Sequence, residues 1–189
     1  MASIVSLDPL WNSIEKVARQ DSYPNSNLLL LFVLVDTLDI AHGGSRAREH
    51  FTLFLQNGSP WMKIRCLSRL KCVFKEERKK REFVEWAIPL LVSQISYASK
   101  VTEMITDILY QNTKISLNLG VVIKALKEMP QAVSVLTRLD SARNFIYRII
   151  TTKDGFALFE NCANYVTKEF KSFMVVLNVI GHCLAGLYI

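Results

Sequence analysis

Residues 61–82 read WMKIRCLSRLKCVFKEERKKRE, and this stretch concentrates the positive charge of the chain. It contains nine lysines and arginines against three acids, a surplus of six that equals the formal charge of the whole protein, +6. At about 100° per residue, the apolar side chains gather on one side of a helix. These apolar residues are Ile64, Leu67, Leu70, Val73 and Phe74.

Basic side chains share the opposite arc of the same predicted helix. They are Arg65, Arg69, Lys75, Lys79 and Lys80. The pattern predicts one helix that packs on a core through its apolar side and presents cations to solvent. Because a rigid row of cations can bind phosphates without reading any base, these five residues are the candidate nucleic-acid contacts. An acidic protein would be attracted to the same face.

Length and composition favour one compact domain over residues 1–189. Half of the residues are hydrophobic, and the seven glycines and five prolines form no stretch long enough to be a linker. The four cysteines include no Cys-x-x-Cys pair, and the first apolar stretch opens with Asp8-Pro9 in place of a secretory signal. We therefore expect a reducing compartment, the cytoplasm.

Helical spacing recurs along the whole chain. Asp8-Pro9 and Ser59-Pro60 each combine an N-cap residue with a proline suited to a first helical turn. Gly43-Gly44 is expected to end a second helix that reaches His42, and Asn57-Gly58 to end a third. No stretch alternates in the way a hairpin requires. The sequence predicts an all-α fold of about eight to ten helices.

The later helices are expected at regular intervals. Their predicted ranges are 83–98, 100–111, 117–128, 130–139, 141–151 and a last one from 154 towards the C-terminus. Pro89 marks either a kink or a new first turn within the first of these.

Catalytic and metal-binding patterns are missing from the sequence. None of the three histidines stands four residues from another or within a Cys/His cluster of zinc-binding spacing. Gly43-Gly44-Ser45 precedes a helix, but no strand comes before it and the Gly-x-x-x-x-Gly-Lys pattern is absent. We predict a protein that is not an enzyme, with no catalytic residue, metal or cofactor.

Residues 172–189, SFMVVLNVIGHCLAGLYI, form an uncharged and mostly apolar end. Two interpretations fit it: a buried closing helix that pairs with the apolar run 28–35, or a tail anchor behind Lys168 and Lys171. A spanning helix needs roughly 20 apolar residues, and Asn178, Gly181 and His182 interrupt this one. The buried helix is therefore favoured over the membrane.

The C-terminal residues YVTKEF at 165–170, followed by FMVVLNVIGHCLAGLYI, resemble the C-terminal part of the small RNA-silencing suppressors of closteroviruses. The shared features are the apolar spacing and an end in Ala-Gly and isoleucine. The resemblance implies an all-helical protein that assembles into a ring, binds double-stranded or small RNA through basic residues, and protects a plant virus from RNA interference. It transfers no individual RNA-contact residue to this chain.

Two functions follow as hypotheses. The first is a cytoplasmic homo-oligomer, a viral suppressor of host RNA silencing, that sequesters duplex or small RNA on its basic helical face regardless of sequence. The second is an all-helical interaction module that binds an acidic host protein or associates with a membrane through its tail. Only the first predicts RNA affinity that falls steeply with salt.

Overall fold

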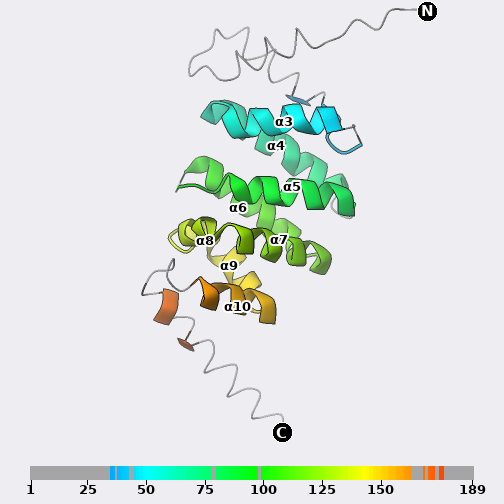
Figure 1. Cartoon of the computed structure of the whole chain (residues 1–189). Helices are drawn as coiled ribbons and strands as arrows, with labels where there is room; N and C mark the ends of the chain where they lie inside the picture. Colours follow the sequence, from blue (N-terminus) through cyan, green and yellow to red (C-terminus); the bar gives the residue numbers. More distant parts are fainter. Residues whose placement is uncertain are drawn as a thin grey trace, which may run out of the picture. The chain divides into compact units, whose positions relative to one another are not determined.

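The computed structural model describes residues 35–36, 38–42, 45–77, 80–97, 99–162, 168, 170–172 and 175–176. Within these ranges the chain is helical and contains no strand, so the all-α prediction is confirmed. Figure 1 shows the helices in chain order. They are α3 (Ser45–Asn57), α4 (Pro60–Glu77), α5 (Arg81–Ser93), α6 (Lys100–Asn112), α7 (Ser116–Glu128), α8 (Pro130–Leu136), the 3-10 helix η1 (Asp140–Ala142), α9 (Arg143–Ile150) and α10 (Lys153–Asn161).

The chain divides into two compact units, Met1–Val84 and Glu85–Ile189. The prediction of one domain over residues 1–189 stays a prediction. The first predicted helix and the apolar run 28–34 lie outside the described residues, as does most of the C-terminal segment 172–189. No helix in the described part of the chain has both the length and the apolar character that a membrane crossing requires.

In the first unit, α3 packs against α4, and the junction between them follows the sequence signals. The N–H of Gly58 donates to the carbonyl of Phe54 at 3.0 Å and ends α3. A Cβ atom on Gly58 would lie 2.3 Å from that carbonyl oxygen, so only glycine fits. The hydroxyl of Ser59 then accepts from the N–H of Met62 at 3.4 Å, confirming Ser59-Pro60 as the start of α4.

The second predicted helix was expected to reach His42, and this boundary is wrong. Residues 40–42 form a turn in which the carboxylate of Asp39 accepts from the backbone N–H of His42 at 2.9 Å. A side-chain oxygen that accepts from a nearby backbone N–H offers the chain an alternative to the helix. Leu38 and Ile40 are buried on either side of Asp39, which anchors the turn to the core.

The basic helix is also shorter than predicted, because α4 ends at Glu77 and α5 begins at Arg81. The rings of Phe74 and Phe83 meet edge to face, with centroids 4.9 Å apart. On one continuous helix these residues would lie about two and a half turns apart and on opposite faces. The break between the helices therefore lets both rings enter one core. α5 then continues through Pro89 to Ser93.

In the second unit, α6 packs against α7, α9 and η1, and α10 packs against α7 and α9. Two of these helices begin at side-chain caps: Ser99 accepts from the N–H of Thr102, and Thr152 from that of Gly155. Aliphatic side chains and phenylalanines from all four α-helices fill the centre of the unit. They include Ile105, Leu109, Val122, Leu126, Phe145, Ile149, Leu158 and Phe159.

Candidate nucleic-acid interface on α4

The buried side of α4 sets which residues reach the solvent. Of the five residues that we predicted to face the core, four are buried, but Ile64 is only half-buried. Met62 and Cys66 are fully buried in its place, so the buried arc is rotated relative to the prediction. The complete buried set is Met62, Cys66, Leu67, Leu70, Val73 and Phe74.

The rotation brings one unpredicted cation, Lys71, onto the solvent side of α4, where Trp61 also lies. Lys71 is exposed, and Trp61, in the first turn, is 66% exposed. Cys72 and Lys75 are exposed as well, and Glu76 is the one exposed acid among the residues of α4. Placing Met62 and Cys66 in the core would have predicted the exposure of Lys71 from the sequence.

Arg65 lies at the edge of this surface and is already paired. Its Nη2 contacts Oδ2 of Asp36, a residue 29 positions earlier in the chain. The two side chains are 38% and 40% exposed, so the pair is partly solvated and contributes little to stability. It does matter for binding, because Asp36 cancels the charge that Arg65 would offer to a phosphate.

Arg69 and Lys75 carry charges that no described residue neutralises. Arg69 is half-buried, and its Nε atom is shielded from solvent without a hydrogen-bond partner among the described residues. Lys75 is exposed in the last turns of the helix, where a cation also interacts favourably with the helix dipole. Both were predicted as contacts. Lys79, also predicted, lies outside the described residues.

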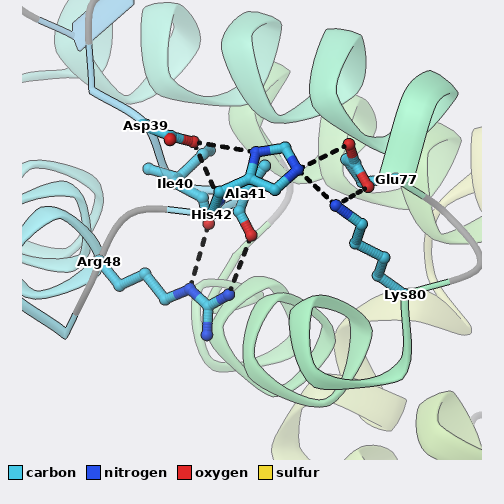
Figure 2. A network of polar contacts seen from close by, with 7 residues as sticks. All are labelled: Asp39, Ile40, Ala41, His42, Arg48, Glu77 and Lys80. Atoms are coloured by element: carbon cyan, nitrogen blue, oxygen red, sulfur yellow. Dashed lines mark hydrogen bonds and ion pairs between the residues drawn. The ribbon is translucent and has the colours of Figure 1, made fainter.

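Lys80 follows α4 and joins a polar network, drawn in Figure 2. Its Nζ atom donates to Oε2 of Glu77 at 2.9 Å and contacts Nε2 of His42. Nε2 of His42 lies 3.4 Å from Oε1 of Glu77, and Nδ1 of His42 lies 3.4 Å from Oδ1 of Asp39. Lys80 therefore secures the end of α4 against the turn at residues 40–42 and does not extend the row of solvent-facing cations on α4.

Arg48 completes this network from α3, as Figure 2 shows. Its Nε donates to the carbonyl of Ile40 at 3.1 Å and its Nη2 to that of Ala41 at 3.3 Å. These two carbonyls lie in a turn and not in a helix, so helical N–H groups are not their donors. The guanidinium of Arg48 donates to them instead. In the sequence, Arg46 and Arg48 follow Gly43-Gly44-Ser45, and no local pattern distinguishes the role of Arg48.

Lys63 lies on the opposite side of α4 from the solvent-facing cations. Burial lowers the pKa of its ammonium group, because desolvation disfavours the charged form. Desolvation likewise raises the pKa of the Cys66 thiol to about 12. Cys66 is fully buried and is therefore not a candidate contact for an anion in solution.

The described residues hold no group of three or more histidine, cysteine, aspartate or glutamate side chains that could bind a metal ion. The polar network of His42, Glu77 and Lys80 is not a metal site either, because the ammonium of Lys80 contacts both the imidazole of His42 and the carboxylate of Glu77. No protein-family model, curated protein or solved structure matches this chain. The resemblance to closterovirus suppressors therefore stays a prediction.

Proposed function

We propose that this chain is a non-enzymatic RNA-binding protein that uses the solvent side of α4 to hold the phosphates of duplex RNA. The observation that carries the proposal is the composition of that side. It presents Arg69, Lys71 and Lys75 with Trp61 at one end and Arg65, paired with Asp36, at the edge; among the residues of α4, Glu76 is the one exposed acid. From the resemblance, we further propose that the protein acts in the host-cell cytoplasm as a viral suppressor of RNA silencing.

The spacing of these cations suits a phosphate backbone. Arg65 and Lys75 are ten residues apart, which corresponds to about 15 Å along the helix axis. Side chains on one rigid helix can contact several phosphates without reading bases, and A-form RNA is recognised mainly through its shape, phosphates and 2′-hydroxyls. Binding is therefore expected to be independent of sequence.

A single face with so few cations binds weakly. We propose that the chain forms a homo-oligomer, because several copies of α4 on one duplex gain affinity through effective concentration. A host protein with an acidic surface is a possible competitor for the same face, since it would meet the same cations.

The test is binding of two unrelated labelled RNA duplexes across a salt series, with the mass of the complex measured by light scattering. We would compare the parent with the triple variant Arg69→Gln, Lys71→Gln, Lys75→Gln. Removing one phosphate-binding cation lowers the slope of log affinity against log salt by about one, so the slope of the triple variant should be lower by about three. The matched control replaces three exposed lysines of the second unit, Lys124, Lys127 and Lys153, by glutamine and lowers the net charge equally.

Cys72 gives a second measurement, because it is exposed on the same side of α4. Bound duplex should slow its alkylation if RNA covers this side. Equal binding by the parent and the α4 variant, with no protection of Cys72, would remove α4 as the site. No binding by the parent even at low salt would reject the RNA-binding function and favour capture of an acidic protein.

A further inference from the structure

Helix α9 divides cleanly into a buried side and an exposed side. The buried side consists of Phe145, Ile146, Ile149 and Ile150, which lie in the core of the second unit. The remaining side chains of the helix are all exposed, and the exposed Thr151 that follows continues the same arc. The exposed set is Arg143, Asn144, Tyr147, Arg148 and Thr151.

The composition of this exposed side differs from that of the other described helices. Among α3 to α10, α9 is the one whose exposed residues include cations but no acid. Every one of its exposed side chains can donate a hydrogen bond. The acid nearest in sequence, Asp140 of η1, pairs with Arg143 at 2.7 Å, and both side chains are largely exposed. Such a pair opens at little cost when a stronger anion arrives.

Tyr147 lies within this basic arc and is 55% exposed. It follows Arg143 by one helical turn and immediately precedes Arg148. The two guanidinium groups are separated by five residues, or about 7.5 Å along the axis. Neither Tyr147 nor Arg148 makes a side-chain hydrogen bond or ion pair with a described residue, so ring and guanidinium are available to a ligand.

We infer that the exposed side of α9 binds unpaired RNA nucleotides, with a base stacked on Tyr147 and phosphates held by Arg143 and Arg148. The inference rests on the proposal that the chain binds RNA, and it adds a second surface of different specificity. An exposed aromatic ring among cations is the arrangement that binds single strands, because an unpaired base presents its face. In a duplex that face is covered by neighbouring base pairs.

The first experiment measures the affinity of a labelled oligoadenylate of about ten nucleotides for the full chain and its variants. Tyr147→Ala should weaken binding about tenfold, while Tyr147→Phe should keep most of it, because the stacking ring is retained. Tyr97→Ala is the matched control, since Tyr97 is 65% exposed in the same unit but lies outside α9. Arg148→Gln should lower the salt slope by about one.

A second experiment does not depend on the folding of any variant. Irradiation of the parent with bound oligoadenylate should cross-link RNA to the peptide that contains Tyr147, which mass spectrometry identifies. A cross-link at α4 with none at α9, or Tyr147→Ala affinity equal to that of the parent, would overturn the inference.

The two proposals fail in different ways. A parent that binds duplex RNA but not oligoadenylate leaves the α4 proposal intact and overturns this one. Both surfaces are supported if the α4 triple variant loses duplex binding but still binds oligoadenylate, and Tyr147→Ala loses oligoadenylate binding. If the α4 variant loses oligoadenylate binding and Tyr147→Ala keeps it, single-stranded RNA binds at α4 and the inference is overturned. An acidic peptide that binds through Tyr147 where RNA does not also overturns it.

Discussion

Nη1 of Arg48 donates to Oε1 of Glu82 at 2.7 Å, which joins α3 to the first turn of α5. The Glu82 side chain is largely exposed, whereas Arg48 is mostly buried and holds the carbonyls of Ile40 and Ala41 with its other nitrogens. The importance of Arg48 therefore comes from the two part-buried hydrogen bonds to carbonyls more than from its surface ion pair.

Arg48→Lys should destabilise the protein by about 1–3 kcal/mol, because a lysine ammonium cannot reproduce the fork that reaches both carbonyls. The measurement is denaturant unfolding followed by circular dichroism. Arg143→Lys is the control, since Arg143 also pairs with a carboxylate at 2.7 Å but is exposed. Its cost should stay below about 0.5 kcal/mol. Equal effects of the two substitutions would show that the carbonyl bonds do not matter.

Two glycines in helices should respond oppositely to alanine. A Cβ atom on Gly155 would lie 2.1 Å from the carbonyl oxygen of Ile149, whereas one on Gly120 would meet nothing within 4 Å. Gly155→Ala should cost about 1–3 kcal/mol through overpacking. Gly120→Ala should stabilise by about 0.5–1 kcal/mol, because alanine favours the helix. Thermal unfolding of both variants checks the pair, and a stabilised Gly155→Ala would contradict the packing at the start of α10.

The cysteines of α4 should differ in reactivity. Cys72 is exposed, whereas burial raises the pKa of Cys66 to about 12 and also raises that of Cys162. Only the thiolate reacts with iodoacetamide, and at pH 8 a thiol of pKa 12 is ionised in about one molecule per ten thousand. Peptide mapping should therefore find Cys72 modified well before Cys66 or Cys162. Alkylation of Cys66 at a similar rate would mean that α4 opens readily from the core.

The sequence predicted the helical fold and the existence of a basic face, but not which cations are paired with acids. Periodicity is a local property, so it located α3, α4 and the caps at Ser59 and Gly58. The pairing of Arg65 with Asp36 joins residues 29 positions apart and leaves no trace in any local pattern. The phase of α4 was misjudged because Cys66, which is fully buried, was left out of the apolar set.

The errors at helix ends have a similar cause. The sequence from 75 to 82 is rich in charge and has the pattern of a solvated helix, but α4 ends at Glu77 and α5 begins at Arg81, and Phe74 contacts Phe83. At Asp39, the side-chain bond to the N–H of His42 competes with the helix that the apolar run predicted. In both places a tertiary or side-chain contact overrides the helical propensity of the segment.

Asp36→Asn should strengthen RNA binding, because it removes the acid that offsets the charge of Arg65 on the side of α4 that we propose as the interface. One additional cation offered to the phosphates should raise the salt slope by about one and the affinity several-fold at low salt. Stability should change by less than about 1 kcal/mol, since both partners are more than a third exposed. The control is Glu103→Gln, which breaks the exposed pair of Glu103 with Lys100 in the second unit and raises the net charge by the same amount. If both variants gain affinity equally, the effect comes from net charge alone. If Asp36→Asn gains nothing while the parent binds RNA, Arg65 does not contact the phosphates and the interface lies elsewhere on the chain.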